Sequence, residues 1–495
     1  MIFSINGEVL MFHAKWKDVL VGLIVCLGFS GNIQATQQPN VLFLFGDDHA
    51  YDAVGLMTNG YVQTPAIDEL AAGGVYFERA YNMGSWSGAV CVASRTMLNA
   101  GKTLWNSKSI WVDANKSRKA KQPIKNDVVS WSQRMSDAGY DTFFAGKWHV
   151  NSYEAKQVFD HIGTVRGGMP RTSGDHHRPI KGQTDTWSPS DPKHLGFWRG
   201  GKHWSEVTAD ETIDYLKQRG KSKDNKPFFA YVGFNAPHDP RQSPQAYLDK
   251  YPVESVPLPG SYMPSYPYTK DIGIWPIRAE TMAPRPRTEF AIKTHRREYY
   301  ALISHLDAQL ARIIAELDAQ GLRENTVIIY TADHGLSLGN HSFMAKQSMY
   351  DHSLASPFII QGPNIPKGVR TQQRIYIQDI VPTTLAMAGL EEAEYQDVEF
   401  ENLLPFNKSG SKNYNQPIYG GYKKESRCII KGDWKLIYYT DLKLYRLFNL
   451  KQDPHEMTDV ATKLENKQRI TELINILESQ QHRFNDDSVQ LENTL

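Results

Sequence analysis

Cysteine is scarce in this chain of 495 residues, in which only Cys26, Cys91 and Cys428 are present. A small fold held together by disulfides is therefore excluded, because such folds need a dense set of crosslinks. Cys26 lies in an apolar N-terminal segment that we expect to be removed. The mature chain can then form at most one disulfide, between Cys91 and Cys428. The alternative is a chemical role for Cys91, and its surroundings favour that alternative.

The chain also lacks a large net charge of either sign. Its formal charge is +1, and 41% hydrophobic and 11% aromatic residues describe an ordinary globular protein. No global field attracts nucleic acid, so we predict no nucleic-acid partner and only local affinity for anions. Internal repeats and low-complexity tracts are missing as well. The length allows one large domain and a smaller one.

Apolar runs long enough to cross a bilayer are missing too. The run at residues 19–29 falls short of the about 20 residues that a membrane-spanning helix needs. Basic residues precede it and small residues follow it, ending at Ala35, as in a secretory signal peptide. We predict a signal peptide over residues 1–35 and an exported protein, periplasmic or secreted, with no membrane association after cleavage. The sequence leaves open whether translation starts at Met1 or at Met11.

One pattern recurs in what the sequence does contain: a strand-length apolar run that ends in reactive polar residues. Amphipathic segments that stop at a glycine precede three of these runs, at residues 128–138, 209–219 and 302–317. The strand ends carry Asp47, Asp48 and His49; Lys147, Trp148 and His149; Pro237, His238 and Asp239; and Asp333 and His334. This alternation predicts an α/β fold with a large, mainly parallel sheet between helices. Ligands bind at the carboxyl edge of such sheets, so we expect one shared site there.

The pattern changes after residue 389. Short strand candidates separated by turns occupy residues 417–419, 427–431, 435–439 and 444–448, and an amphipathic segment follows at 466–479. We predict a large domain over residues 36–389 and a smaller C-terminal subdomain with an antiparallel sheet over residues 390–495. Apolar residues in the segments 163–204 and 252–287 show neither a helical nor a strand period. We interpret them as insertions around the mouth of the site, with plain surface loops as the alternative.

Carboxylates gather at two of the strand ends. Asp47, Asp48 and Asp333 would repel one another unless a cation or hydrogen-bond donors lay between them. Oxygen-rich ligation suits Ca²⁺, with Mg²⁺ second, whereas Zn²⁺ usually takes more nitrogen or sulfur. We predict one Ca²⁺ per chain, held by these three acids and His334. Helix capping or ion pairing of the acids is the alternative.

The segment 91–95, Cys-Val-Ala-Ser-Arg, carries the sharpest chemical signal. Its first and last residues share one helical face. The segment resembles the activation motif of the type I sulfatases of the alkaline phosphatase superfamily, in which the cysteine is oxidised to formylglycine. Ala93 stands where that motif usually has proline. The strand-end residues and Lys346 follow the order of that family, and residues 435–456 resemble its C-terminal subdomain.

The resemblance implies an alkaline-phosphatase-like fold and a sulfuric ester hydrolase. A maturation enzyme would convert Cys91 to formylglycine, which would join the calcium ligands. Arg95 would hold the formylglycine hydrate, and Lys147 and Lys346 would bind the sulfate. His149 would act as the base of the elimination step, and His238 would protonate the leaving oxygen, shared with Lys346.

Export, tryptophans near the motifs and basic runs at residues 116–125 and 285–297 favour a sulfated oligosaccharide or polysaccharide as the substrate. Core packing and solvated surface are the alternative fates of these side chains. The sugar, the sulfated position, exo or endo action and the oligomeric state stay open. Two other functions also stay open: a phosphonate monoester hydrolase or phosphodiesterase of the same superfamily, and a non-catalytic protein that binds sulfated glycans and keeps Cys91 unmodified.

Overall fold

The computed structural model describes residues 38–122, 128–168, 174–274, 277–412 and 414–491. The predicted signal peptide lies outside the described residues, as does part of the basic run at 116–125. From Gln38 onward the chain forms one structural unit, so the predicted boundary at residue 389 stays a prediction. Within the described residues, no helix combines the length and the apolar character that crossing a membrane requires.

The centre of the fold is a large sheet in which nine of the described strands pair. Their order is β11-β2-β10-β9-β1-β8-β4-β5, with β12 beside β2. The bounds are β1 Asn40–Gly46, β2 Val75–Tyr81, β4 Asp141–Lys147, β5 His161–Arg166, β8 Phe228–Gly233, β9 Thr326–Ala332, β10 Ala355–Gln361, β11 Val369–Thr371 and β12 Ile375–Tyr376. The run β9-β1-β8-β4-β5 is parallel throughout, and β10 is antiparallel to both of its neighbours. The predicted mainly parallel sheet is confirmed.

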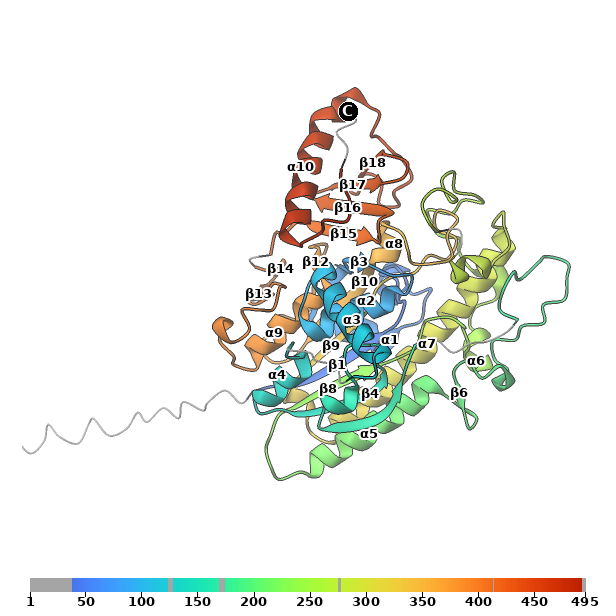
Figure 1. Cartoon of the computed structure of the whole chain (residues 1–495). Helices are drawn as coiled ribbons and strands as arrows, with labels where there is room; N and C mark the ends of the chain where they lie inside the picture. Colours follow the sequence, from blue (N-terminus) through green and yellow to red (C-terminus); the bar gives the residue numbers. More distant parts are fainter. Residues whose placement is uncertain (1–37, 123–127, 169–173, 275–276, 413, 492–495) are drawn as a thin grey trace, which may run out of the picture. The chain divides into compact units, whose positions relative to one another are not determined.

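Helices cover both faces of this sheet, as the continuous apolar run of β1 predicts. Leu42 and Leu44 of β1 pack in one cluster with helices α1 (Pro65–Ala72), α5 (Trp204–Lys221) and α7 (Glu289–Ala319). Val41, Phe43 and Phe45 pack on the opposite face with α2 (Val90–Ala100), α4 (Trp131–Asp137) and α9 (Ile380–Met387). The helix layers are visible in Figure 1.

Two of the helices run further than their amphipathic segments predict. Helix α5 begins at Trp204 and continues through Gly220 to Lys221, so this glycine does not end it. Helix α7 extends over 31 residues, from Glu289 to Ala319. The cause is tertiary packing, because both helices lie against the sheet and against each other. Contacts with the rest of the fold outweigh the low helix propensity of one glycine.

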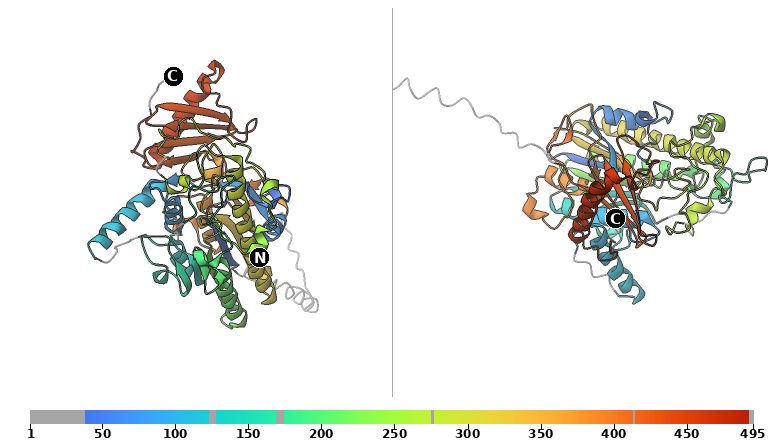
Figure 2. Two further views of the ribbon diagram at one scale, coloured as in Figure 1. Left: turned by 90° about the vertical axis from the view of Figure 1, so that its right-hand side faces the viewer. Right: turned by 90° about the horizontal axis from the view of Figure 1, so that it is seen from above.

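The C-terminal part forms the predicted antiparallel sheet. Strands β15 (Ile418–Tyr422), β16 (Ser426–Lys431), β17 (Trp434–Tyr439) and β18 (Leu444–Asn449) pair in sequence order. Helix α10 (Lys467–Arg483) packs on this sheet, as Figure 2 shows. A fifth strand, β3 (Gly84–Ser85), comes from far earlier in the chain and pairs parallel to β15. This strand immediately precedes the Cys91 segment and joins the two sheets, which the sequence patterns do not predict.

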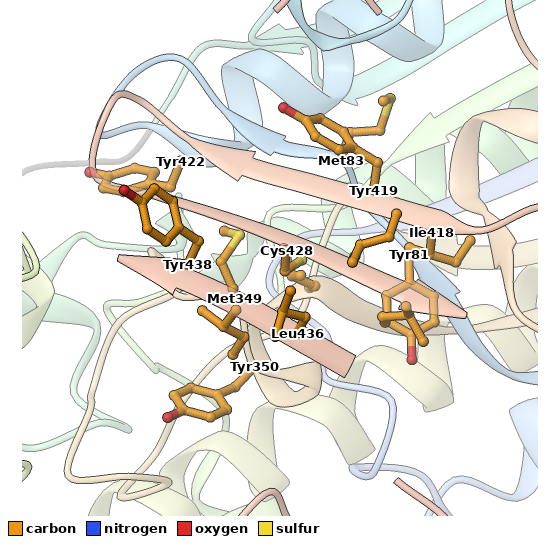
Figure 3. Close-up of a cluster of buried hydrophobic side chains, with 14 of the residues drawn as sticks. Tyr81, Met83, Met349, Tyr350, Ile418, Tyr419, Tyr422, Cys428, Leu436 and Tyr438 are labelled. Atoms are coloured by element: carbon orange, nitrogen blue, oxygen red, sulfur yellow. The ribbon is translucent and has the colours of Figure 1, made fainter. Parts of the chain in front are cut away.

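Cys428 lies in an apolar cluster between the C-terminal sheet and the loop after β9. Figure 3 shows it with Leu436 and Tyr438 of the sheet and with Met349 and Tyr350 of the loop. Burial raises the pKa of the Cys428 thiol to about 12. Both Cys428 and Cys91 have free thiols. The structure therefore contains no disulfide between them.

Candidate active site

The predicted site residues meet at one edge of the sheet because four neighbouring strands end there. Gly46 of β1 pairs with Ala332 of β9, and Gly233 of β8 pairs with Gly146 of β4. Asp47 and Asp333 follow the first pair directly, and Lys147 follows Gly146. The parallel register thus places residues from positions 47 to 333 side by side, as the carboxyl-edge rule predicts.

Three carboxylates and one imidazole form a buried group at this edge. Asp47 Oδ1, Asp48 Oδ2 and His334 Nε2 are buried and have no hydrogen-bond partner among the described atoms. His334 Nδ1 lies 2.9 Å from the carbonyl oxygen of Gly335 and donates to it, so Nε2 is the nitrogen that faces the acids, 3.5 Å from carboxylate oxygens of Asp48 and Asp333. Ligand atoms of Asp47, Cys91, Asp333 and His334 all lie within 4.8 Å of one another. Most of these candidate ligand atoms are carboxylate oxygens, and Asp47 Oδ1 and Asp48 Oδ2 accept no hydrogen bond from the described residues. Such a set fits a hard divalent cation.

The electrostatics of these acids also fit a cation. Burial, followed by the charge of Asp333, raises the pKa of Asp47 well above its usual value. Burial acts on Asp333 in the same direction, but His334 and Arg95 outweigh it and lower the pKa of that carboxyl. The Lys147 ammonium bonds the other oxygen of Asp47, and Arg95 lies 3.9 Å from Oδ1, yet burial outweighs both. A bound cation would stabilise the ionised form of Asp47.

Cys91 occupies the first turn of α2, where unpaired backbone N–H groups favour negative charge. Its Sγ accepts a hydrogen bond of 3.2 Å from Lys346 Nζ. Burial opposes ionisation of the thiol, but Lys147 and Lys346, together with hydrogen bonds from His149 and His238, lower its pKa well below the usual value. Cationic and hydrogen-bonding groups therefore surround this position.

Arg95 lies one turn further along α2 and is completely buried. Its Nε donates to Asp333 Oδ2 at 3.1 Å, and its terminal nitrogens donate to the carbonyl oxygens of Lys147, at 2.8 Å, and Gly46, at 3.3 Å. One guanidinium thus connects the ends of β9, β4 and β1. It offsets the charge of Asp333 and also holds the strand ends together.

The remaining predicted residues lie around the same point. Lys346 Nζ donates to Asp48 Oδ1 at 2.6 Å and lies 2.9 Å from His238 Nε2. His149 follows β4 with a backbone φ of 52° and hydrogen-bonds the Cys91 thiol. Burial lowers the pKa of His149, so its ring is neutral and able to accept a proton. All the residues that the sequence singled out for catalysis and metal binding are brought together, although their individual roles stay predictions.

His49, which also follows β1, points elsewhere. Its Nδ1 lies 2.6 Å from the Tyr330 hydroxyl and its Nε2 lies 2.9 Å from the carbonyl oxygen of Ala53. Burial lowers its pKa to about 4, so the ring is a neutral structural element. Position at a strand end alone does not place a side chain in the site.

Two charged residues near His238 were not predicted as site residues. Asp239 Oδ1 lies 3.0 Å from His238 Nδ1, and its other oxygen accepts a hydrogen bond from Arg278. Asp239 directly follows His238 in the sequence, which could have indicated it. Arg278 lies in the second insertion, between β8 and α7, and no local pattern pointed to it. This contact brings the insertion to the site, as interpreted from its irregular sequence.

Comparison with known proteins agrees with this arrangement. A family model described as Sulfatase matches residues 39–390, which is most of the chain. The chain belongs to the sulfatase family. The sulfatase enzyme inferred from the Cys91 motif and the ordered strand ends is thereby confirmed. A second model, described as N-sulphoglucosamine sulphohydrolase, C-terminal, matches residues 339–483 of this sulfatase.

The sulfatase is similar to named relatives over nearly its whole length. It is 25% identical to the N-acetylglucosamine-6-O-sulfatase of Bacteroides thetaiotaomicron, over 92% of this chain and 88% of that protein. A protein solved in complex with its substrate D-glucosamine-2-N,6-O-disulfate shares the fold, with a TM-score of 0.65, 21% identity and coverage of 92% and 100%. The phosphonate monoester hydrolase of Agrobacterium radiobacter does so as well, with a TM-score of 0.66, 18% identity and coverage of 89% and 96%.

Proposed function

We propose that this sulfatase removes sulfate from a sulfated oligosaccharide or polysaccharide with a formylglycine made from Cys91 and one bound Ca²⁺. The observation that carries the proposal is the ring of Lys147, Lys346, His149 and His238 around Cys91, beside carboxylate oxygens that accept no hydrogen bond from the described residues. A sulfate monoester is anionic, so a site for it must offset charge on the oxygens and protonate the leaving alcohol. The relative that acts on N-acetylglucosamine and the neighbour solved with a glucosamine disulfate support a carbohydrate substrate.

Asp47, Asp48, Asp333 and His334 would hold the cation, with the modified residue 91 beside them. A hard cation bound there would polarise the nucleophilic oxygen at position 91 and offset negative charge on the sulfate. Mg²⁺ is the second choice, because it demands a stricter octahedral geometry than this irregular donor set suggests. Arg95 would keep Asp333 and the strand ends in register around the ion.

A formylglycine hydrate carries two hydroxyls, so it supplies one as the nucleophile for sulfur and a second whose deprotonation expels the bound sulfate. The residues of the chain itself serve both stages. Lys147 and Lys346 bind the sulfate oxygens as point charges. His149, neutral and in contact with position 91, accepts the proton of the second hydroxyl. His238, with Lys346, donates a proton to the leaving oxygen of the sugar.

Mass measurement of the peptide that contains Cys91 tests the modification. The protein is expressed with and without a formylglycine-generating maturation enzyme. We expect loss of sulfur and gain of an aldehyde oxygen at Cys91 only when that enzyme is present. The Cys428 peptide is the internal control, because its thiol lies in an apolar cluster outside the motif. Complete conversion would show that the maturation enzyme accepts Ala93 in place of the usual proline.

Turnover of matched esters by one purified sample tests the reaction. We expect hydrolysis of aryl sulfate and of sulfated glycan fragments, and little hydrolysis of aryl phosphonate or phosphodiester. The second candidate function is phosphonate or phosphodiester hydrolysis, which the shared fold of the phosphonate monoester hydrolase makes worth testing. Dominant turnover of the phosphorus esters would reject the sulfatase proposal. Binding of glycans by a protein with an unmodified Cys91 and no turnover would instead indicate the non-catalytic alternative.

Residues 1–35 are proposed to direct export of the protein to the periplasm or the medium. The charged start, the short apolar run and the small residues before Thr36 support this proposal. N-terminal sequencing of the protein recovered from the periplasm or the medium should begin at Thr36. Recovery of uncleaved protein from the cytosol alone would contradict it.

A further inference from the structure

The two ring nitrogens of His238 have different partners. Nδ1 lies 3.0 Å from Asp239 Oδ1 and 2.9 Å from the carbonyl oxygen of the same residue. Both oxygens can only accept, so Nδ1 carries the hydrogen and donates it to them. Nε2 is then the nitrogen that faces the site, 2.9 Å from Lys346 Nζ and 3.6 Å from Asp48 Oδ2.

Asp239 is itself held firmly. Its side chain is 2% exposed, and its second carboxylate oxygen accepts a hydrogen bond from Arg278. Arg278 belongs to the 3₁₀ turn Arg278–Thr281 and its side chain is 47% exposed, so it reaches inward from the surface. A carboxylate fixed on both oxygens is a rigid acceptor for the His238 ring. Without it, only the peptide carbonyl oxygen would orient the ring.

We infer that Asp239 and Arg278 are positioning residues for the proton transfer to the leaving group. This inference rests on the proposed function. When the S–O bond to the sugar breaks, its electron pair stays on the sugar oxygen, which takes a proton from the His238 and Lys346 pair. In the imidazolium form of His238, Asp239 keeps the hydrogen on Nδ1, so the proton that is given up is the one on Nε2, which faces that oxygen; Arg278 keeps the Asp239 carboxylate in place. Neither residue touches the ester itself.

The leaving group separates this role from a general contribution to folding. A sugar alkoxide is a strong base and depends on protonation as it leaves, whereas a nitrophenolate leaves without a proton. Loss of ring orientation should therefore slow hydrolysis of a sugar sulfate much more than hydrolysis of 4-nitrophenyl sulfate. Partial unfolding, in contrast, lowers the active fraction and slows both reactions by the same factor.

The experiment compares Asp239→Ala and Arg278→Met with the wild-type enzyme on both esters. We expect kcat on the sugar sulfate to fall about 10²-fold in Asp239→Ala, while kcat on 4-nitrophenyl sulfate falls less than about tenfold. In Arg278→Met, kcat on the sugar sulfate should again fall more than kcat on 4-nitrophenyl sulfate, but by a smaller factor than in Asp239→Ala. Arg278→Lys should regain part of the lost kcat. Asp185→Ala is the matched control. It removes another arginine–carboxylate pair, with Arg178 at 2.7 Å, which does not include His238, and it should leave the ratio of the two rates unchanged.

Equal loss on both esters, or no loss on either, would overturn the inference. A second measurement decides it without turnover. In ¹⁵N spectra of histidine-labelled enzyme, the wild type should show His238 protonated at Nδ1, assigned with His238→Gln, and Asp239→Ala should change that signal. An unchanged signal would also overturn the inference. If the wild type hydrolysed neither sulfate, the proposed function would fail, while this spectrum would still show whether Asp239 keeps the hydrogen on Nδ1.

Discussion

At the scale of single residues, the site depends on groups that offset one another's charge. Cys91 combines a position in the first turn of a helix with two ammonium groups and two imidazoles around its sulfur. Buried alone, any one of these groups would be destabilising. Together with the acids of the metal group they place opposite charges beside one another, which explains how so many ionisable residues can be buried at one edge of the sheet.

The first prediction concerns Cys91. Cys91→Ser should fold with nearly unchanged stability, because the side chains are similar in size, and it should lose more than about 10³-fold in kcat on aryl sulfate. A serine has one hydroxyl and cannot expel the sulfate that it receives. Steady-state kinetics and the melting temperature are the measurements. Cys428→Ala should keep kcat, and full activity of Cys91→Ser would refute the proposed nucleophile.

The second prediction concerns Gly168, which packs against His149. A Cβ at Gly168 would lie 2.9 Å from His149 Nε2, so the ring would have to shift from its present position. Gly168→Ala should lower kcat about tenfold or more, because small displacements of catalytic groups are costly. Gly167→Ala is the control, since a Cβ there would meet no atom within 4 Å. Equal activity of the two variants would show that the placement of His149 does not limit turnover.

At the scale of elements, a side chain distant in sequence caps the start of a helix. Helix α1 has no side-chain cap from its own N-cap residue. Asp307 of α7 instead accepts hydrogen bonds from the backbone nitrogens of Ala66, at 3.1 Å, and Ile67, at 2.9 Å. The cap of one helix is thus supplied by another.

A third prediction follows from the burial of Asp307, which raises its pKa to about 7 from an ordinary value of 3.8. The folded state holds this proton more tightly than the unfolded state, so Asp307 makes the protein less stable as pH rises from about 4 to about 7. In Asp307→Asn that loss should vanish. Relative to wild type, the variant should gain roughly 4 kcal/mol of unfolding free energy between these pH values, at about 1.4 kcal/mol for each of about three pKa units. Urea unfolding at each pH measures it, and a constant difference would contradict it.

The fourth prediction concerns the junction of β3 with β15. Gly84 has a φ of 97°, and a Cβ there would lie 2.0 Å from the carbonyl oxygen of Gly421. Gly84→Ala should therefore break the pairing that joins the two sheets and should lower stability by about 2 kcal/mol or more. The melting temperature and limited proteolysis are the measurements. Gly88→Ala, where a Cβ would meet nothing within 4 Å, should melt as wild type does.

At the scale of the whole molecule, metal binding and stability should be linked. The proposed ligands come from the ends of β1 and β9 and from α2, so an ion bound to them would connect elements far apart in sequence. A ligand that binds only the folded state raises its stability.

The fifth prediction is that Ca²⁺ raises the melting temperature and that EGTA lowers it together with activity. At a free Ca²⁺ concentration of about 100 times Kd, the gain should be about 2.7 kcal/mol. Asp333→Asn should no longer respond to Ca²⁺, whereas Asp185→Ala should respond as wild type does. Scanning calorimetry and titration calorimetry provide the measurement. A melting temperature that does not depend on Ca²⁺ would remove the calcium proposal.

Local sequence patterns were sufficient to predict much of this protein. Apolar runs of strand length, each followed by Asp, His or Lys, predicted the parallel sheet and the edge that carries the site, because burial on both faces leaves a readable pattern. The Cys91 segment predicted the family. The short alternating runs after residue 389 predicted the antiparallel sheet.

Only the tertiary structure decided which side chains point into the site and how the two sheets meet. His49 and Asp239 both follow buried strands, yet the first binds Tyr330 and the second orients His238. Arg278 reaches His238 through Asp239 from an insertion without a period, and β3 joins the C-terminal sheet through two residues. Such contacts depend on backbone direction and packing across long separations, which periodicity along the chain does not encode.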